Sequence, residues 1–421
     1  MWLIAEKRAS RGEILVSVAT EPGGELGLRL RSLLLAAYIA ALPLSMLTIG
    51  SVGSALKAFS VILAGFAILD LAVTHDVVRR FGAAEVAWLA YVAYMVTSLL
   101  WDAGTVGVAT TVGMIQLTAI ALLLTRIPWS DRLRTVVEVS WLTCASICAL
   151  LLAFSGGRLE YVERAVILLP GGGSDANELC AYFVVPLAIL GDRLVSLRSS
   201  WSRLWASILI SVFAFCVVST GSRGGLIACL VSFVISVVLA LKRRGVIKAL
   251  GGLVTMAATV MVTLAVGALQ LFPDKVLARL SLAALAEDGG SGRDVIWRES
   301  WNLMMAEGPR VFFGFGPFGN QVTGPTMHNQ FLQSFVDGGL IGAVLFVWLC
   351  LSLLKRSSLV SVYLAALVGT LTILLTLSAS ASFKPVWAVF MICLLPRRFP
   401  PAGGFQANVA EVPLHPSPDR I

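Results

Sequence analysis

Stretches of apolar residues, each near the length that crosses a bilayer, follow one another along most of this chain. A transmembrane helix needs roughly 20 mainly apolar residues, and about twelve such stretches occur. The pattern predicts an all-α, polytopic membrane protein with a single transmembrane domain over residues 33–396. The expected spans are 33–50, 53–73, 84–101, 104–125, 135–155, 178–192, 204–220, 224–241, 247–272, 329–354, 357–378 and 382–396.

The composition also indicates a membrane protein. Of the 421 residues, 57% are hydrophobic and only 13% are charged, whereas a soluble domain is about 25% charged. Residues 1–32 have charges at both ends and a Pro-Gly-Gly break, which differs from the pattern of a secretory signal peptide. We expect residues 1–32 to be a cytoplasmic segment and the proline-rich residues 397–421 to be a disordered cytoplasmic tail.

The basic residues are concentrated in alternate loops. If the chain crosses twelve times, most of the 32 Lys and Arg residues share the side of the N-terminus, and the positive-inside rule makes that side cytoplasmic. Both termini are then cytoplasmic, and the two long loops, 155–177 and 272–328, face outward. Contact between the basic inner face and anionic lipid accounts for the net charge of +8. We therefore do not expect a nucleic-acid partner.

The longer outer loop, 272–328, is predicted to have a helical part and an irregular part. Its helical part breaks at Gly289-Gly290, and the second piece contains the tryptophans and other apolar residues that suit a helix at the membrane interface. Residues 308–326 are too rich in Gly and Pro for regular structure. This arrangement would bring His328 to the outer rim of the bundle.

The segment STGSRGGLIA, residues 219–228, joins two expected spans through a short outer turn. In one interpretation Arg223 extends to the membrane interface, and Gly224 and Gly225 allow close helix packing. In the other, Arg223 and Ser222 form an anion site with the N–H groups of a helix N-terminus, and the glycines adopt positive φ or let the backbone approach a ligand. The segment alone leaves both interpretations open.

Arg293 and His328 lie on the same predicted side as Arg223. Arg293 follows glycines at an expected helix start, where it would pair with Asp294 or Glu287 on the surface or share an anionic ligand with Arg223. Pyrophosphate suits such a pair because each guanidinium can bind two oxygens. His328 is either a polar residue at a span boundary or a base. Together the three residues are typical of a site where a base deprotonates a hydroxyl while cations stabilise a phosphate leaving group.

The sequence does not indicate a metal or another cofactor. The outer loops contain no Asp-x-Asp pair and no cluster of His and Cys, which are the usual donors for metal ions. A Walker phosphate-binding loop is also missing. All seven cysteines fall within expected spans without metal-ligand spacing, so we expect them to pack in the core.

Three segments carry a resemblance to a known family: STGSRGGLIA, SGRDVIWRESWNLMMAEGPRVFFGFGPFGN and HNQFLQSFVDGGLIGAVLF. In order and spacing they resemble the O-antigen ligase and polymerase superfamily of bacterial inner-membrane glycosyltransferases. The last segment has the ligase pattern of His, a small polar residue, nine residues, Gly, two residues and Gly, at His328, Asn329, Gly339 and Gly342. The likeness covers roughly residues 150–355.

The resemblance implies a GT-C-like helical fold and an inverting, metal-independent transfer. Ligases of this type move a polysaccharide from undecaprenyl pyrophosphate to a sugar of lipid A-core on the periplasmic side. The implied partners are these two substrates and membrane lipid, without an obligate protein partner. The implied location is the bacterial inner membrane, as a multi-pass protein whose active site faces the periplasm.

The resemblance also implies roles for individual residues. At the matching positions, His328 would be the base, and Arg223 and Arg293 would bind the donor pyrophosphate. Asn177, at the start of a span in SDANELCAYFVVPLAIL, resembles a mid-chain motif of the family and is expected to bind substrate. The further expected substrate-binding residues are Arg158, Ser222, Gly224 and Asn329.

Three alternatives remain. An O-antigen polymerase shares the fold and the donor, although the complete His-to-Gly spacing favours the ligase. A protein O-oligosaccharyltransferase would need an outer domain for its polypeptide acceptor, and the sequence has no large candidate at its C-terminal end. A secondary transporter or lipid flippase usually has related halves and charges near mid-membrane. Here the unusual residues gather on one face, with Lys57 as the main charge inside a span.

Overall fold

The computed structural model describes most of the chain between residues 22 and 395. Residues 1–21 of the predicted N-terminal segment and the whole predicted tail lie outside the described residues. The described residues are 22–49, 53–73, 81–101, 105–124, 127, 130–158, 164–169, 172–265, 268–281, 293–317, 327–357, 361–378 and 383–395.

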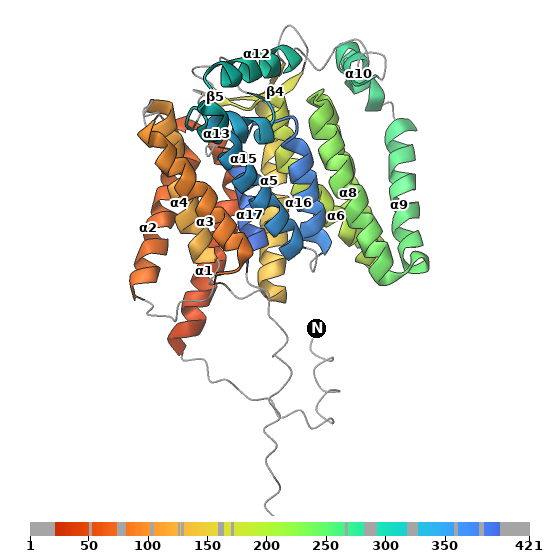
Figure 1. The fold of residues 1–421 in the computed structure, drawn as a ribbon. Coiled ribbons are helices and arrows are strands. Elements are labelled where there is room, and N and C mark those ends of the chain that lie inside the picture. Colours follow the sequence, from red (N-terminus) through yellow and green to blue (C-terminus); the bar gives the residue numbers. More distant parts are fainter. Residues whose placement is uncertain are drawn as a thin grey trace, which may run out of the picture.

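Helices occupy every predicted apolar stretch, and the long ones run side by side as a bundle (Figure 1). Their bounds are α1 Pro22–Ala40, α2 Ala55–Val73, α3 Ala83–Thr97, α4 Thr105–Leu124, α5 Asp131–Ser155, α6 Ala176–Ser196, α7 Ser200–Ser219, α8 Arg223–Arg244, α9 Val246–Ala265, α15 Gln330–Ser357, α16 Ser361–Ile373 and α17 Lys384–Leu394. Shorter elements are η1 Leu42–Met46, η3 Ser98–Leu100, η4 Ala268–Leu271, α10 Asp274–Leu280, α12 Arg293–Ala306 and α13 Arg310–Phe313.

Six of the described helical segments are long and apolar enough to cross a membrane. They are α3 with η3, α5, α6, α7, α8 and α15; the other apolar helices span 10–17 residues over the part whose side chains the structure describes. The mostly helical, membrane-type architecture therefore agrees with the prediction from sequence. The number of twelve crossings remains a prediction.

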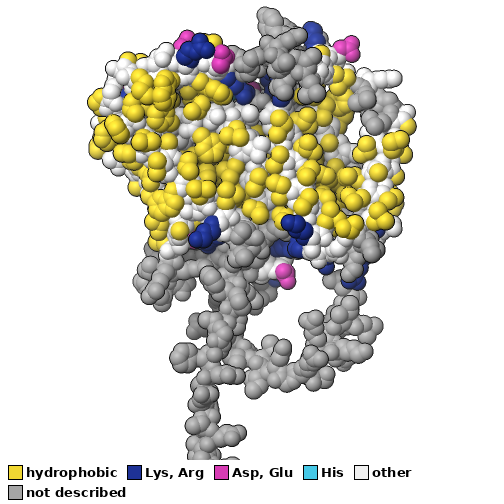
Figure 2. All heavy atoms as spheres, turned by 45° about the vertical axis from the view of Figure 1, so that its right-hand side comes forward, with side chains coloured by type: hydrophobic (Ala, Val, Ile, Leu, Met, Phe, Trp, Pro, Cys, Tyr) yellow, Lys and Arg dark blue, Asp and Glu magenta, His cyan; other side chains and the backbone are white. Residues whose placement is uncertain are grey.

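The surface of the bundle carries a broad hydrophobic belt, and Lys and Arg side chains lie near its two borders on the face shown in Figure 2. Large apolar side chains such as Leu230, Val254 and Val344 are more than half exposed. Soluble monomers rarely expose apolar patches of this extent. The belt is typical of a surface that contacts lipid.

The first predicted span, 33–50, is wrong in its second half. α1 begins at Pro22, inside the segment expected to precede the membrane, and ends at Ala40. Pro43 then lies in the 3-10 helix η1. Because proline has no N–H and clashes with the preceding turn, it disfavours continuation of an α-helix, and here the chain changes to a 3-10 helix.

Two small antiparallel sheets add to the helices that the all-α pattern predicted. The second sheet lies in the outer loop 155–177, where Val166 and Ile167 of its central strand are buried and Leu168 is exposed. The short apolar run of this strand cannot span a bilayer but can cover the end of the bundle. The strands are β1 Thr48–Ile49, β2 Gly53–Ser54, β3 Gly156–Arg158, β4 Ala165–Leu169 and β5 Gly172–Gly173, with sheet orders β1-β2 and β3-β4-β5.

The central helix α6 runs parallel to α8. Ser232 Oγ donates a 3.0 Å hydrogen bond to the carbonyl of Val184, and Ser236 Oγ donates a 2.5 Å bond to the carbonyl of Ala188. These bonds lie on either side of Pro186, which interrupts the hydrogen bonding inside α6. Since the order of contacts is the same along both helices, α6 and α8 start at the same end of the bundle.

Buried ion pairs hold the other end of these helices. Glu138 of α5 pairs with Arg193, and Asp192 of α6 pairs with Arg243 of α8. Both carboxylates are buried, and Arg134 contacts each of them as a second partner, so the five side chains form one network of compensated charges. The interpretation of Lys57 as the main charge within the spans was therefore incomplete.

The predicted tenth span, 329–354, is a kinked helix and not a continuous one. Inside α15, Gly339 has φ +62° and ψ −161°, a conformation that glycine adopts easily and other residues do not. A Cβ added there would lie 2.2 Å from the carbonyl carbon of Phe312. The backbone of α13 therefore packs directly against the kink.

The Gly- and Pro-rich segment that was expected to be irregular contains the short helix α13 and then contacts this kink. The N–H of Phe315 donates a 2.9 Å hydrogen bond to the carbonyl of Val336, and the N–H of Gly316 donates a 2.8 Å bond to the carbonyl of Asp337. The kink frees these carbonyls from the helix, and the loop supplies the missing donors. The glycines thus allow the backbone of the outer loop to contact the backbone of α15 directly.

Candidate functional site

The three residues predicted to perform chemistry lie at helix starts. Arg223 is the first residue of α8, Arg293 is the first residue of α12, and His328 precedes α15 by two residues. Figure 1 shows the starts of α8 and α12 at the same end of the bundle, with α12 lying across that end. The N–H of Gln330 donates a 2.8 Å hydrogen bond to the carbonyl of Leu374, which joins the start of α15 to the end of α16.

The turn between α7 and α8 fixes the position of Arg223. The turn consists of residues 220–222, and Gly221 within it has φ +58°. Ser222 Oγ accepts a 3.0 Å hydrogen bond from a backbone N–H in the first turn of α8 and thereby caps the helix. Arg223 Nε donates a 2.7 Å bond to the carbonyl of Arg279 in α10. Arg223 is therefore attached to the long outer loop.

Gly224 and Gly225 allow close helix packing. A Cβ on Gly224 would lie 2.1 Å from Oγ1 of Thr376, and one on Gly225 would lie 2.4 Å from the Cys180 side chain. The expectation that these glycines adopt positive φ is wrong, because the positive φ of this turn belongs to Gly221. Both glycines lie within the helix, where positive φ would break the hydrogen-bond ladder.

Asn177 connects the start of α6 to this turn. Its Oδ1 accepts a 2.6 Å hydrogen bond from Ser222 Oγ and a 3.3 Å bond from Arg164 Nη2. The neighbouring Asp175 caps α6 by accepting a 2.7 Å bond from the N–H of Asn177. Asn177 is buried, so its side chain helps to hold the site together.

Arg164 and Arg279, which lie in the two outer loops of the predicted topology, belong to the same site. Arg164 Nε donates a 2.8 Å hydrogen bond to the carbonyl of Thr220. A Cβ on Gly221 would lie 3.5 Å from Cγ of Arg164 and 3.7 Å from Cδ of Arg279. Both side chains therefore lie against Gly221 in this turn. In the sequence, their only sign of a functional role was their position in the outer loops.

We call Arg164, Arg223, Arg279 and Arg293 the arginine cluster. Burial lowers the pKa of Arg164, and the positive charges of Arg279 and Arg293 lower it as well, whereas Asp175 opposes them. Arginine nevertheless remains protonated in proteins. Mutual repulsion of close cations is relieved when an anion binds between them.

His328 has a strained backbone that is held on both sides. Its φ is +49°, which is uncommon outside glycine, although histidine is among the residues enriched there. The carbonyl of Met327 accepts a 2.8 Å hydrogen bond from Trp297 Nε1, and the N–H of Asn329 donates a 3.2 Å bond to Ser378 Oγ. Strain that neighbouring contacts maintain in this way is typical of functional sites.

The electrostatic surroundings of His328 favour its neutral form. Burial lowers the pKa of His328, the charge of Arg293 lowers it further, and Asp175 acts in the opposite direction. The imidazole is therefore neutral near pH 7 and able to accept a proton. Arg293 and Asp175 therefore lie close enough to His328 for their charges to change its pKa.

The predicted interfacial helix α12 packs onto the start of α15. Met304 of α12 is buried together with Phe315, Met327 and Val336. Trp301, on the more exposed face, stacks on the ring of Phe335. This apolar contact places Arg293 and Trp297 beside the segment that carries His328.

Two other predicted substrate-binding residues have local roles. Asn329 Oδ1 accepts hydrogen bonds of 3.0 and 3.2 Å from the N–H groups of Phe331 and Leu332, so it caps α15. Arg158 ends β3, where its backbone pairs with Ala165. Arg158 therefore lies opposite Ala165, the residue that directly follows Arg164.

The described polar groups of the site are suited to an anion. They combine guanidinium groups with a neutral imidazole, an amide and hydroxyl groups. Guanidinium groups bind phosphate oxygens in pairs, and the imidazole can take a proton from a hydroxyl. Across the described ranges, no group of three or more His, Cys, Asp or Glu side chains is arranged to hold a metal ion.

Comparison with known proteins gives one match. Residues 206–347 match the family model described as O-antigen ligase. The matched region runs from α7 into α15 and contains Arg223, Arg293 and His328. No curated protein matches the chain. The match and the bundle of long apolar helices support an assignment to the O-antigen ligase/polymerase superfamily and point to a multi-pass membrane protein.

Proposed function

We propose that this protein is an O-antigen ligase of the bacterial inner membrane. It would transfer a polysaccharide from undecaprenyl pyrophosphate to a sugar hydroxyl of lipid A-core on the periplasmic face. The observation that carries this proposal is a partly buried His328 held by contacts on both sides, whose pKa is lowered by burial and by Arg293 of the arginine cluster. Transfer from a glycosyl pyrophosphate uses a base for the acceptor hydroxyl and an anion site for the departing pyrophosphate.

The reaction is a single displacement that inverts the anomeric carbon. His328 accepts the proton of the acceptor hydroxyl as its oxygen forms a bond to that carbon. The bond from the carbon to the pyrophosphate oxygen breaks, and the leaving group keeps the electron pair. Arg223 and Arg293 stabilise the negative charge that develops on the pyrophosphate, so the transfer proceeds without a metal. The imidazolium then releases its proton to solvent.

The remaining residues of the proposed site bind the substrates. Asn177 and Ser222, which are hydrogen-bonded to each other, and Gly224 adjoin the donor pyrophosphate at the start of α8. Asn329 orients the acceptor beside His328, and Arg158 holds a phosphate of the donor or the core. In this proposal the bundle crosses the membrane twelve times with a GT-C-like arrangement and both termini in the cytoplasm. The proposed transfer needs only the two lipid-linked substrates and no protein partner.

A transfer assay tests the proposal. The protein in lipid nanodiscs is mixed with undecaprenyl-pyrophosphate-linked polysaccharide, lipid A-core and EDTA, and the joined glycolipid is measured. The variants are His328→Asn, which tolerates positive φ, and Arg223→Ala. The control is Arg203→Ala, where Nε bonds to the carbonyl of Leu197 away from the site.

Wild type and the control should form the glycolipid, and the two site variants should not. Lengthening of the donor chain by wild type would identify a polymerase instead. Full activity of His328→Asn would show that His328 is not the base. Loss of transfer in EDTA that returns with a divalent cation would contradict the metal-independent reaction.

A further inference from the structure

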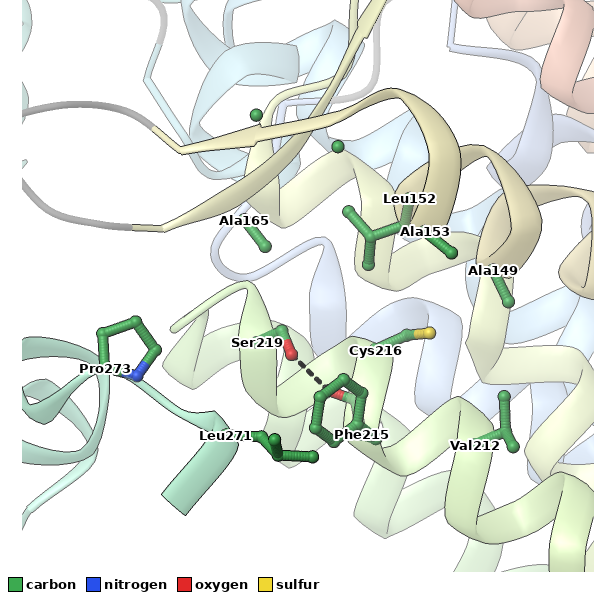
Figure 3. Close-up of a pocket in the computed structure, with 12 residues that line it drawn as sticks. Ala149, Leu152, Ala153, Ala165, Val212, Phe215, Cys216, Ser219, Leu271 and Pro273 are labelled. Atoms are coloured by element: carbon green, nitrogen blue, oxygen red, sulfur yellow. Dashed lines mark hydrogen bonds between the residues drawn. The ribbon is translucent and has the colours of Figure 1, made fainter. Parts of the chain in front are cut away.

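Two buried polar residues of α15, Gln333 and Asp337, lie one helical turn apart and take no part in the reaction proposed above. A polar side chain in an apolar helix can be satisfied within that helix: Figure 3 shows Ser219, whose hydroxyl donates to the carbonyl of Phe215 four residues earlier in α7. Gln333 instead bonds to the Asp337 side chain and to a residue that precedes the helix. A buried polar network whose members are satisfied specifies a single arrangement.

The Gln333 amide connects Asp337 to the segment that carries the proposed base. Its Nε2 donates a 2.8 Å hydrogen bond to Oδ1 of Asp337, and its Oε1 accepts a 3.3 Å bond from the N–H of Met327. A carboxylate only accepts hydrogen bonds, so the NH2 end of the amide faces Asp337. The oxygen end then faces Met327, directly before His328. The Asp337 carboxylate thus determines which end of the amide meets the Met327 N–H.

Contacts with the outer loop and α3 fix the position of Asp337. Its carbonyl accepts a 2.8 Å hydrogen bond from the N–H of Gly316, and the next carbonyl, that of Gly338, accepts a 2.9 Å bond from the hydroxyl of Tyr94 in α3. A Cβ on Gly314 would lie 2.3 Å from the Asp337 carbonyl oxygen. Asp337 therefore orients the Gln333 amide from a backbone that is held on several sides.

The backbone at His328 depends on such contacts. Its φ of +49° is uncommon outside glycine and persists where the surrounding structure maintains it. The carbonyl of Met327 bonds to Trp297 and its N–H bonds to Gln333, so both polar backbone groups of the residue before His328 are fixed. Loss of the Gln333 bond would let this segment relax towards more common backbone angles and move the imidazole.

We propose that Gln333 and Asp337 are positioning residues for the transfer: Asp337 orients the Gln333 amide, and the amide holds the segment that places His328 at the acceptor hydroxyl. The inference rests on the proposed function and adds to it two residues that do not touch the substrates. Because both act through the base, their loss lowers kcat and leaves the binding of the donor unchanged.

Steady-state transfer in nanodiscs tests these roles. Gln333→Met keeps the length of the side chain and removes both hydrogen bonds, so kcat should fall about tenfold, while the KM for the undecaprenyl-linked donor should not change. The control Ser232→Ala removes a buried 3.0 Å bond between α8 and α6, and it should lower the unfolding temperature without changing kcat. A raised donor KM with unchanged kcat, or equal losses of kcat in the two variants, would overturn the proposal.

An exchange of donor and acceptor separates orientation of the amide from folding. Asp337→Asn removes the carboxylate that selects the amide orientation and should lower kcat about fivefold. Addition of Gln333→Glu places the carboxylate at position 333, where its oxygens can accept from the Met327 N–H and from the new amide at position 337. The double variant should therefore recover most of kcat. If it is folded by thermal unfolding but no faster than Asp337→Asn, the orienting role is wrong.

NMR of the imidazole locates the base without the transfer reaction. The chain has three histidines, so the signal of His328 in isotope-labelled protein is identified by its loss in His328→Asn. This signal should shift in Gln333→Met and stay unchanged in Ser232→Ala. If wild type forms no joined glycolipid but the signal shifts as expected, the ligase proposal fails and the positioning role stands. If transfer is normal and the signal does not shift, the ligase proposal stands and the positioning role is wrong.

Discussion

Arg164 donates a 2.8 Å hydrogen bond from Nε to the backbone carbonyl of Thr220, and this contact ties the outer loop before β4 to the turn that precedes Arg223. The bond joins two segments that are far apart in the sequence. Through it, the β3-β4 hairpin supports the geometry of the arginine cluster. The contact therefore makes Arg164 a positioning residue as well as a positive charge.

Replacement of Arg164 by Ala should lower kcat/KM for the donor. A hydrogen bond from a charged donor contributes about 1.5–3 kcal/mol, so the loss should be about tenfold or more. Arg164→Lys keeps the charge without the Nε bond and should recover part of the donor affinity. Steady-state transfer assays measure both values. The control Arg203→Ala removes a similar bond, from Arg203 Nε to a loop carbonyl, and equal losses in both variants would argue against a specific role.

Loss of the Ser222 hydroxyl should weaken both stability and transfer. Ser222→Ala removes the cap of α8 and the bond to Asn177, and loss of a cap costs about 1 kcal/mol. Ser130→Ala removes the equivalent cap of α5, outside the proposed site. Thermal unfolding should show a similar shift for both variants, whereas only Ser222→Ala should slow transfer. Equal transfer rates would indicate that the Ser222 cap has no role beyond folding.

The pH profile of kcat/KM should move when Asp175 is neutralised. Asp175 raises the pKa of His328 against burial and Arg293, which lower it. Asp175→Asn preserves a good helix cap and removes the charge, so the pKa of His328 should fall. Because the base acts when unprotonated, activity is lost as the pH falls through this pKa. The acidic limb should therefore shift to lower pH in the variant, and a shift to higher pH would contradict the assignment of His328.

The indole N–H of Trp297 should be needed to position His328. Trp297→Phe keeps an aromatic ring but removes the bond to the carbonyl of Met327. A neutral hydrogen bond is worth about 1 kcal/mol, so kcat should fall roughly fivefold. Trp301→Phe, on the exposed side of the same helix, is the control and should retain full activity. An unchanged kcat for Trp297→Phe would show that this bond does not determine the position of the base.

Replacement of Gly339 by Ala should destabilise the protein strongly. The variant would place a Cβ in left-handed backbone and 2.2 Å from the Phe312 carbonyl carbon. Gly245 also has positive φ but open space around it, so Gly245→Ala isolates the conformational cost of about 1–2 kcal/mol. Denaturation in detergent micelles should show a larger loss for Gly339→Ala than for Gly245→Ala. Equal losses would mean that α13 moves away without cost.

The helices and three of the candidate residues could be predicted from local pattern. Apolar stretches of spanning length form helices because the bilayer requires internally satisfied backbone hydrogen bonds, and this constraint acts along the chain. His328, Arg223 and Arg293 stood out because polar residues between apolar runs are few and lie in recognisable segments. The family match to residues 206–347 includes all three.

The kink at Gly339 and the positions of Arg164 and Arg279 depend on tertiary contacts. The N–H groups of Phe315 and Gly316 satisfy carbonyls in α15, and this exchange of partners makes the kink possible. Arg164 and Arg279 come from different outer loops and meet around Gly221. Local patterns record only the neighbours of each residue along the chain. Contacts between distant segments arise when the helices pack, and that packing decides which charges share a site.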